Sequence, residues 1–551
     1  MKVSEAVANA FVKEGTEVVF GLMGDGNMSW WSAISKYAQV RMIAVRDEGA
    51  GLAMAQGWAR YTNKVGVCSV THGPGITRMT TSLVAAVRSH TPVVICTSKT
   101  PFNSENHIQF VEQERVVGAT GAGYLEALTP SFAENAVRQA FYRARLESRP
   151  IVLSIPHDIQ AEECDGDIDD YQPSGTMYAG RQHIRPDRAR LNEAVNIIGA
   201  SKRPVVIVGR GAMEPEAIEA AERLAKRIGA LIATTLIAKG LLGNSEYCAG
   251  ISGLFSPRAV MQLYQETDCV IAIGASLNTR TIAGGHLYPN ARIVHIDIAP
   301  HLLMGNEQAA DCYIQGDAAA TIQDIDDMLE KQGVTKEGYR TDAVLKILQS
   351  ADRDPGEFEI GPGTVDPREA ARIMDERLPS NVGVVIGAGH FSSFPVMIMK
   401  KPRALHIFVH DFGSIGQGLA NAIGIGVACG QPLLCVEGDG GAMQNIQELD
   451  TAARLGLKLL YVIMNDEGFG AEYHMMTARG LNPKLALYRS PDFAGAGRVF
   501  GGRGRIATSL ENIAAGIDEF LAGEGPMVLD IRVSRNVVSI PYRRAQFAQD
   551  V

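Results

Sequence analysis

One strand–helix–strand pattern in the last third of the chain constrains its fold more than any other feature. The apolar run 433–437 predicts a short buried strand that continues directly into Gly438-Asp439-Gly440. An amphipathic helix over 447–455 and a second apolar run over 459–464 follow, and the second run ends at Asn465-Asp466. Because such a crossover is right-handed and makes its two strands parallel, we expect both carboxyl ends at one edge of a sheet.

Two aspartates would meet at that edge. Asp439 and Asp466 each follow one of the two strands, at the place where open parallel sheets bind ligands. Two carboxylates, backbone carbonyls beside glycine and exposed amides suit Mg²⁺ that carries a diphosphate. The alternative is a pair of unrelated turn aspartates, each of which is common by itself.

The length of the chain predicts three domains. Single cores stop growing near about 250–300 residues, and this chain has 551 residues. Strand-like runs alternate with helical patterns throughout, which predicts an α/β fold of doubly wound parallel sheets covered by helices. Two polar segments without periodicity, 161–186 and about 331–363, are interpreted as linkers. We therefore place the domains at 1–165, 186–335 and 364–551.

Twelve apolar runs are the clearest expected strands. The first and third domains look loosely alike, but the sequence does not demonstrate an internal repeat. Val3, Val7 and Phe11 recur at helical spacing, so a helix is expected at the N-terminus. The expected strands are 18–20, 65–70, 93–96, 151–155, 204–208, 269–273, 293–298, 382–386, 406–409, 433–436, 459–464 and 528–531.

Charge and composition exclude several classes of protein. The net charge is −9 without a basic cluster, which argues against nucleic-acid and anionic-membrane partners. No apolar run approaches the roughly 20 residues of a membrane span, and the N-terminus lacks the pattern of a signal peptide. The eight cysteines form no C-x-x-C pair, which favours reduced thiols. We therefore expect a cytoplasmic protein.

Motifs from all three domains together carry a resemblance. Glu48 lies in Val45-Arg46-Asp47-Glu48-Gly49-Ala50, Gly73-Pro74-Gly75 follows, and the Gly-Asp-Gly and Asn-Asp pair comes last. Over essentially its whole length the chain resembles the thiamine-diphosphate-dependent enzymes of the pyruvate decarboxylase, acetolactate synthase and benzoylformate decarboxylase superfamily. The resemblance implies pyrimidine-binding, middle and diphosphate-binding domains, with thiamine diphosphate and Mg²⁺ as cofactors.

The resemblance also implies an assembly. In this superfamily the active site lies between the first domain of one subunit and the third domain of another. A homodimer is therefore the minimum, and a homotetramer is expected.

Glu48 is the residue that the resemblance assigns to the pyrimidine ring. The matching glutamate hydrogen-bonds N1′ of the aminopyrimidine and promotes the tautomer that takes the proton from thiazolium C2. Such a role needs a carboxyl group shielded from water. The alternative is a solvated carboxylate in the first turn of a helix, favoured by the helix dipole.

A glycine turn after the strand 406–409 is assigned to the same ring. By resemblance, the carbonyl of Gly413 accepts a hydrogen bond from the pyrimidine amino group, with Ser414 beside it. Ile415 would wedge between the two cofactor rings, a task that suits a stiff, branched apolar side chain. The alternative is an ordinary turn with one buried isoleucine.

The expected metal site departs from the family pattern. Relatives commonly have Asn-Asn where this chain has Asn465-Asp466, so a carboxylate takes the ligand position of Asp466. The extra charge is tolerable beside a bridging cation, and it also predicts a tighter metal requirement. Asp439 and the carbonyl of Gly468 complete the expected ligands.

Two glycine-containing segments are expected to bind the diphosphate. One provides backbone amides, because Gly441 stands where relatives often have serine. The other follows a buried strand, and its histidine is a possible phosphate donor or an ordinary loop histidine. The expected residues are Gly440, Gly441, Ala442, Gly387, Ala388, Gly389 and His390.

Three polar residues are the candidates for substrate chemistry. Asp25 and Glu472 match acidic positions of the decarboxylase branch, and His72 matches a histidine of benzoylformate decarboxylase. An acid beside the reacting centre can protonate the carbanion and release an aldehyde. The paired histidines of those decarboxylases are absent from 100–110, where His107 resembles the synthase branch. Each candidate can equally be an ordinary loop residue, and His474 is a weaker one.

The predicted function is a thiamine-diphosphate-dependent C–C lyase that decarboxylates a small 2-oxo acid without oxidation, with carboligation through an enamine intermediate as a further outcome. The alternatives are an acetolactate-synthase-like carboligase, a C–C hydrolase of a diketone, and a cofactor-binding protein without turnover. A nicotinamide dehydrogenase is disfavoured, because Gly209-Arg210-Gly211 is followed by Glu214 and the dinucleotide fingerprint fails. FAD or ADP in the middle domain stays undecided.

Overall fold

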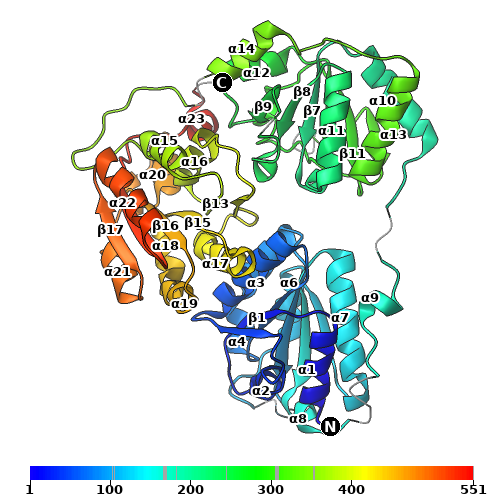
Figure 1. Ribbon diagram of the computed structural model, residues 1–551, viewed down its shortest axis with the longest axis vertical. Coiled ribbons are helices and arrows are strands. Elements are labelled where there is room, and N and C mark those ends of the chain that lie inside the picture. The colour runs from blue at the N-terminus through cyan, green and yellow to red at the C-terminus, as the bar shows by residue number, and fades with distance from the viewer. Residues whose placement is uncertain are drawn as a thin grey trace.

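Three parallel sheets organise the chain. The computed structural model describes residues 1–101, 104, 106–164, 170–180, 183–243, 245–303, 309–351 and 354–549. Its strands form three six-stranded sheets with parallel pairing and helices packed on them (Figure 1). The predicted α/β fold with three parallel-sheet domains is confirmed. The boundaries at 1–165, 186–335 and 364–551 stay predictions, and residues 165, 550 and 551 lie outside the described part.

The first domain has the strand order β2-β1-β3-β4-β6-β5. Its strands are β1 (Val18–Gly21), β2 (Arg41–Ala44), β3 (Gly66–Ser69), β4 (Val93–Lys99), β5 (Gly123–Glu126) and β6 (Ile151–Pro156). Its helices are α1 (Val3–Lys13), α2 (Met28–Ile34), α3 (Glu48–Thr62), α4 (Pro74–Arg78), α5 (Thr80–Arg88), α6 (Gln113–Ala119), η1 (Pro130–Phe132), α7 (Ala133–Glu147) and α8 (His157–Ala161). The predicted N-terminal helix is α1.

The middle domain has the order β12-β11-β10-β7-β8-β9. Its strands are β7 (Pro204–Val208), β8 (Leu231–Thr234), β9 (Cys248–Ile251), β10 (Cys269–Ile273), β11 (Arg292–Asp297) and β12 (Cys312–Gln315). Its helices are α10 (Arg188–Ala200), η2 (Arg210–Ala212), α11 (Pro215–Arg227), η3 (Leu236–Ala238), α12 (Arg258–Gln265), η4 (Ala283–Gly285), α13 (Ala318–Lys331) and α14 (Asp342–Ser350).

The third domain has the order β14-β13-β15-β16-β18-β17. Its strands are β13 (Gly383–Ile386), β14 (His406–Phe408), β15 (Leu433–Gly438), β16 (Leu459–Asn465), β17 (Arg503–Ala507) and β18 (Met527–Arg532). Its helices are α15 (Pro367–Arg377), η6 (His390–Ser392), α16 (Ser393–Ile398), α17 (Gln417–Cys429), α18 (Asp439–Asn445), η7 (Ile446–Glu448), α19 (Leu449–Arg454), α20 (Gly470–Ala478), η8 (Pro483–Ala486), α21 (Phe493–Val499), α22 (Leu510–Ala522) and α23 (Ile540–Phe547). Counted from its own first strand, this order repeats that of the first domain.

The segment 331–363 is not a plain linker, so that prediction is wrong in part. It contains α14, whose first turn is capped by Thr341 because the Thr341 side chain accepts a hydrogen bond from the Val344 amide. Val344, Leu345, Ile347 and Leu348 recur at helical spacing and pack against the middle-domain core. Polar flanking residues hide this short amphipathic pattern in the sequence.

The other predicted linker, 161–186, lacks strands and has one short helix, α9 (Ser174–Met177), among its described residues. Part of it is held on the first domain by Glu14, whose carboxylate accepts hydrogen bonds from the Ser174 amide at 2.7 Å and the Tyr171 hydroxyl at 2.9 Å. The segment therefore docks on the first domain before the chain enters the middle one.

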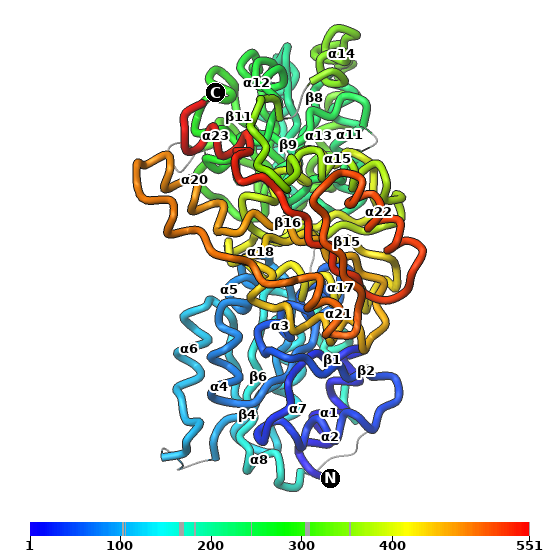
Figure 2. Tube along the Cα trace, turned by 90° about the vertical axis from the view of Figure 1, so that its left-hand side faces the viewer, coloured from blue at the N-terminus to red at the C-terminus, as the bar shows by residue number. Residues whose placement is uncertain are grey.

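The first and third domains share one continuous core. Helix α3 lies against α17 in both views (Figures 1 and 2), and apolar residues of both sheets belong to a single buried cluster. Glycines allow the close approach: a Cβ at Gly57 would lie 2.3 Å from the Asn421 carbonyl oxygen, and one at Gly424 would lie 1.9 Å from the Met54 oxygen. Larger side chains would force the two helices apart.

Among the described residues, no helix is long and apolar enough to cross a membrane. All eight cysteines are free thiols, as their spacing predicts.

A buried ionic contact joins all three domains. Asp411, in the loop between β14 and α17, has a side chain only 1% exposed. Its carboxylate accepts hydrogen bonds from Arg60 of α3 at 3.2 Å and from Arg210 of the middle domain at 2.5 Å. The loop is therefore fixed from two sides.

This contact yields a stability prediction. Asp411→Ala should destabilise the protein by about 3–5 kcal/mol, because it leaves the shielded guanidinium group of Arg60 and the half-buried one of Arg210 without their counter-charge. Urea unfolding followed by circular dichroism measures the effect. The matched control is Asp518→Ala, which removes an exposed pair with Arg377 at 3.0 Å and should change the midpoint little. Equal shifts for the two variants would contradict the structural role of Asp411.

Candidate active site at the carboxyl ends of the strands

The predicted site residues of the third domain gather at one edge of its sheet. The loop 387–390 follows β13, Asp439 follows β15, and Asp466 follows β16. Strands β13 and β15 are neighbours on either side of the point where the strand order reverses. Open parallel sheets bind ligands at such a reversal, so the arrangement matches the sequence prediction.

Asp439 is buried and held in place by short contacts. Its side chain is 1% exposed, and Oδ2 accepts a hydrogen bond from the Gly468 amide at 3.2 Å. The Ser490 hydroxyl lies 2.9 Å from both Asp439 Oδ2 and Asn465 Oδ1. Burial raises the pKa of Asp439, although the contact with Ser490 opposes that rise. The aspartate therefore sits where its charge needs a partner.

The side chain next to Asp439 is that of Asp466, a second buried carboxyl group. Burial and the nearby charge of Asp439 raise the pKa of Asp466 to about 8. The next residue, Glu467, has φ 57°, a left-handed conformation that is uncommon outside glycine and turns the chain sharply towards Gly468. Two neighbouring buried carboxyl groups, both with raised pKa values, form a site that a divalent cation would stabilise.

His390 lies beside this pair as a neutral ring. It is 5% exposed, and burial together with the neighbouring His474 lowers its pKa well below the ordinary value. Its Nε2 accepts a hydrogen bond from the Ser539 amide at 3.1 Å, so the proton of the neutral ring is on Nδ1. A Cβ built on Gly470 would lie 2.6 Å from Asp466 Oδ2 and 3.6 Å from His390 Nδ1. The Nδ1–H donor therefore faces the region of Asp466.

Sequence reasoning missed the importance of Glu437, the last charged residue before Gly-Asp-Gly. It is fully buried, and burial raises its pKa to about 7. Its Oε2 accepts a hydrogen bond from the Leu419 amide at 3.3 Å, near the start of α17. A Cβ at Gly387 would lie 2.2 Å from Glu437 Oε1, and one at Gly441 would lie 2.9 Å from it. Glu437 thus lies directly beside both expected diphosphate segments.

The other expected backbone donors lie close to this carboxylate or to aromatic rings. Gly440 leaves no room for a side chain, because a Cβ there would lie 2.7 Å from the Phe469 ring. Ala442 and Ala388 are buried, and Gly389 lies against Phe391. The small residues at these positions are therefore required by packing.

The loop expected to meet the pyrimidine is accessible. Gly413 has φ 77°, and a Cβ built on it would meet nothing within 4 Å. Ser414 and Ile415 are partly buried, and Gly416 caps α17 with φ 83°. Since Asp411 anchors the start of this loop, its open side is held in a fixed place.

Glu48 begins α3 and is 8% exposed. Its Oε2 lies 3.2 Å from Nε of Arg78, an exposed arginine. The turn ahead of Glu48 is fixed by a residue that sequence reasoning missed, Glu448 of the third domain. Buried Glu448 accepts hydrogen bonds from the amides of Arg46 at 2.8 Å and Asp47 at 2.9 Å. The third domain therefore positions the start of α3.

Asp25 and His72 come together at the carboxyl edge of the first sheet. The Thr71 hydroxyl and the Gly26 amide donate to Asp25 Oδ1, and these bonds lower its pKa although partial burial opposes them. His72 is 3% exposed, its Nδ1 lies 2.6 Å from the Ser98 hydroxyl, and burial lowers its pKa. Its Nε2 has no hydrogen-bond partner in the described structure.

The remaining candidates are placed differently. His107 lies near His72, with ring centroids 5.6 Å apart, while Phe102, Asn103 and Glu105 of the same predicted region lie outside the described residues. Glu472 is exposed on α20, whereas His474 of the same helix is 2% exposed and lies 4.4 Å from the His390 ring. His474, the weaker candidate of the sequence analysis, is therefore the residue of α20 that lies beside His390.

The structure forms two separate groups of predicted residues. One group lies at the edge of the third sheet around Asp439 and Asp466, and the other lies at the edge of the first sheet with Asp25, Glu48 and His72. No hydrogen bond or ion pair joins Glu48 to Asp439 or Asp466 in the described part of the chain.

The residues at the two edges fit thiamine diphosphate and Mg²⁺. Two neighbouring buried carboxyl groups with raised pKa values suit a divalent cation, and a neutral histidine donor beside them suits a phosphate oxygen. An accessible glycine carbonyl loop and a shielded Glu48 suit the pyrimidine ring.

Comparison with known families agrees with this geometry. Residues 1–120 match the model of the "Thiamine pyrophosphate enzyme, N-terminal TPP binding domain". Residues 191–325 match the "Thiamine pyrophosphate enzyme, central domain", and residues 387–531 match the "Thiamine pyrophosphate enzyme, C-terminal TPP binding domain". The three matches cover β1–β4 of the first sheet, all six strands of the middle sheet and β14–β18 of the third sheet.

Several curated relatives resemble the chain over nearly its whole length. The acetolactate synthase large subunit of Haemophilus influenzae is 24% identical over 97% of this chain and 94% of its own length. The acetolactate synthase large subunit of Parasynechococcus marenigrum is 27% identical over 96% of this chain and 87% of its own length. Acetolactate synthase 1 of Nicotiana tabacum is 26% identical over 98% of this chain and 83% of its own length.

Burial of His474 gives a pH prediction. Burial lowers its pKa from 6.5 to about 4, so between these pH values the unfolded chain binds a proton that the folded chain does not. The folded state of the native protein should therefore lose up to about 3 kcal/mol relative to a variant without this histidine as pH falls from 6.5 to 4.

Urea midpoints measured across this range for the native protein, His474→Gln and His474→Leu test the effect. Both replacements should flatten the pH profile, because neither side chain titrates. Parallel profiles for all three proteins would contradict the burial of a neutral histidine.

Proposed function

Since this chain belongs to the thiamine pyrophosphate enzyme family, we propose that it uses thiamine diphosphate and Mg²⁺ to decarboxylate a small 2-oxo acid and to join the remaining acyl fragment to a second carbonyl compound. The observation that carries this proposal is the pair of neighbouring buried carboxyl groups, Asp439 and Asp466, at the carboxyl ends of β15 and β16. Full-length similarity to acetolactate synthases favours the carboligase outcome.

The overall reaction balances without an oxidant. A 2-oxo acid R–CO–COO⁻, an acceptor R′–CHO and one proton give CO₂ and the hydroxyketone R–CO–CH(OH)–R′. If the acceptor is a proton alone, the products are CO₂ and the aldehyde R–CHO, which is the decarboxylase alternative. When bound, thiamine diphosphate supplies the carbon nucleophile and the electron sink for the bond cleavage.

The third domain would hold the charged end of the cofactor. Asp439, Asp466 and the carbonyl of Gly468 would bind Mg²⁺ through oxygen. His390 would donate its Nδ1–H to a phosphate oxygen, since its Nε2 already accepts a hydrogen bond from Ser539. Backbone amides would supply further donors, and the candidates are Gly387, Ala388, Gly389, Gly440, Gly441 and Ala442.

The pyrimidine end would be held by residues of both edges. Glu48 would share a proton with the ring nitrogen, and its low exposure shields that contact from water. Gly413 would accept from the ring amine, with Ser414 and Ile415 shaping the cofactor. Arg78 is exposed, so its ion pair with Glu48 can open when the ring binds.

Substrate-side proton transfers would fall to Asp25, His72 and Glu472. The lowered pKa of Asp25 keeps it ionised at neutral pH, so it can accept a hydrogen bond or a proton from the substrate side. Neutral His72 has an Nε2 without a partner among the described residues, and that atom can bind a substrate oxygen. Glu472 lies exposed on α20, where a neighbouring subunit can cover it.

A second copy of the chain would complete the site. The family resemblance supports a site shared between the first domain of one subunit and the third domain of another, and hence a homodimer at least, with a homotetramer as the expected assembly. The cytoplasmic location, and FAD or ADP in the middle domain, stay predictions that these observations leave open.

Exchange of the C2 hydrogen of bound thiamine diphosphate tests the role of Glu48. Glu48→Gln should slow this exchange by at least about 100-fold, because the carboxyl group no longer shares a proton with the ring. Hydrogen–deuterium exchange followed by proton NMR measures the rate, and cofactor binding should remain within a few-fold. Glu5→Gln replaces the first-turn glutamate of α1 and is the matched control. Equal exchange in the native protein and Glu48→Gln would favour a cofactor-binding protein without turnover.

Product analysis tests the choice of reaction. With a panel of 2-oxo acids and aldehyde acceptors, the holoenzyme should release CO₂ and form a hydroxyketone as the main product. Gas and liquid chromatography quantify both products. Free aldehyde as the main product would favour the decarboxylase reading, and cleavage of a cyclic diketone without CO₂ release would favour the hydrolase reading.

A further inference from the structure

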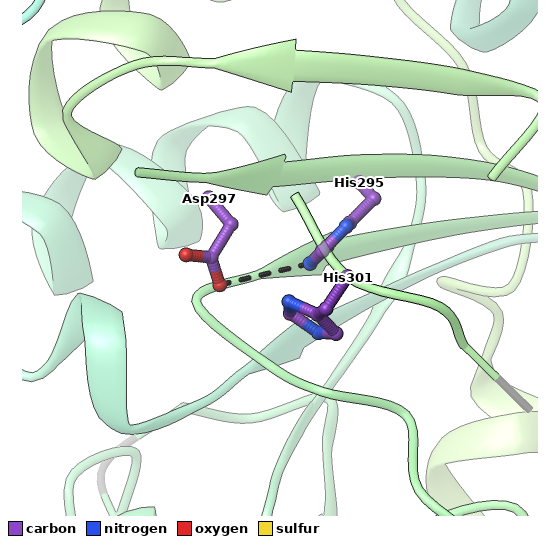
Figure 3. A group of neighbouring side chains, drawn as sticks. All are labelled: His295, Asp297 and His301. Carbon is purple, nitrogen blue, oxygen red and sulfur yellow. Dashed lines mark ion pairs between the residues drawn. The ribbon is translucent and has the colours of Figure 1, made fainter. Parts of the chain in front are cut away.

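The middle domain contains a cluster of metal-binding side chains that the proposed function does not use. His295 lies on β11, Asp297 ends that strand, and His301 lies in the loop that follows (Figure 3). One ligand atom from each residue lies within 4.8 Å of the other two. The cluster is at the carboxyl edge of the middle sheet, an edge at which parallel sheets bind ligands.

The two residues on β11 face each other closely. His295 Nε2 lies 3.7 Å from Asp297 Oδ2, and Figure 3 shows the two side chains pointing toward one another. The other carboxylate oxygen of Asp297 accepts a hydrogen bond from the Ala299 amide at 3.2 Å. This contact fixes the carboxylate, so its free oxygen stays directed at the histidine.

His295 carries a buried polar atom that pairs only loosely with Asp297, at 3.7 Å. The residue is 1% exposed, and its Nε2 has no hydrogen-bond partner in the described part of the chain. Burying such a group without a partner costs free energy, so a ligand at this point would remove that cost. The ring also lies beside Tyr313 of β12, with centroids 5.6 Å apart, which restricts its orientation.

His301 closes the cluster from the solvent side. Its ring is 4.6 Å from that of His295 at an interplanar angle of 78°, and the residue is exposed. Leu303, two residues later, is fully buried in the middle-domain core. The loop is therefore anchored just beyond His301. His301 Nδ1 lies 3.4 Å from the Ala299 carbonyl oxygen, which leaves Nε2 as the ring atom that can bind a ligand.

The donor set selects a class of metal ion. Two imidazoles and one carboxylate suit Zn²⁺, whereas Mg²⁺ and Ca²⁺ prefer oxygen ligands alone. Zinc bonds of about 2.0–2.2 Å in tetrahedral geometry place donor atoms roughly 3.3–3.6 Å apart. The 3.7 Å between His295 and Asp297 is close to this value, and a small rotation of exposed His301 would bring the third donor in.

We propose that His295, Asp297 and His301 bind one Zn²⁺ ion, with the fourth position open to water or another small ligand. The site is independent of the Mg²⁺ site proposed for Asp439 and Asp466, which offers only oxygen ligands and belongs to another domain. The charge of Asp297 also acts on His90 of the first domain, so the zinc site lies near the contact between the two domains.

Zinc retention by the cofactor-loaded protein tests the proposal. The holoenzyme, saturated with thiamine diphosphate and Mg²⁺, is incubated with Zn²⁺ and dialysed, and the metal is counted by mass spectrometry. One Zn²⁺ per chain is expected. Asp297→Asn and His301→Gln should each weaken Zn²⁺ binding by at least about tenfold, the smallest effect usual for zinc-site partners. Zinc-edge X-ray absorption should show two imidazole ligands at about 2.0–2.1 Å.

The matched control is His183→Gln. His183 is an exposed histidine that lies 3.0 Å from Asp317. Among the described residues this pair has no third metal-binding side chain beside it, so the loss of His183 should leave Zn²⁺ binding unchanged. His301 is exposed, and its replacement should not prevent folding. Absence of retained Zn²⁺ in the native protein, or equal retention in all variants, would overturn the proposal.

Discussion

Parallel pairing places the carboxyl ends of all strands of a sheet along one edge, and the site of this chain depends on that constraint. It brings Asp439 and Asp466 together although a helix separates them in sequence, and it groups Asp25, Glu48 and His72 in the first domain. The first and third sheets share one strand order and one joint core through α3 and α17. The two edges are therefore fixed by the same packing.

Buried carboxylates hold the domains, and with them the two sheet edges, in fixed positions relative to each other. Glu448 of the third domain accepts two amides ahead of Glu48, and Asp411 pairs with arginines of the other two domains. Glu437 lies beneath the glycines expected to meet a diphosphate. Such groups are costly to bury, and each is kept by hydrogen bonds or an opposite charge. Asp439 and Asp466 differ, because burial raises the pKa of both carboxyl groups and the charge of Asp439 raises that of Asp466 further, although Arg535 opposes the rise.

The sequence predicted the central strands well, because continuous apolar runs mark strands buried on both faces. Five of the strands it missed are sheet edges, where burial alternates or is partial, as in 41–44, 123–126, 248–251, 312–315 and 503–507. Motif spacing predicted Asp439, Asp466 and His390 at one edge. It did not reveal Glu437 or Glu448, since their roles arise from contacts with residues distant in sequence, nor the zinc cluster, whose third member is set by a loop.

Calorimetric titration of the protein with thiamine diphosphate and Mg²⁺, in buffers of different ionisation enthalpy, tests the central claim most directly. If Asp439 and Asp466 bind the metal, cofactor binding requires Mg²⁺ and releases close to one proton at pH 7, because the pKa of Asp466 is about 8 without metal. The release should decline as pH rises above 8. Binding that is independent of Mg²⁺ and releases no proton at pH 7 would contradict the two-carboxylate metal site.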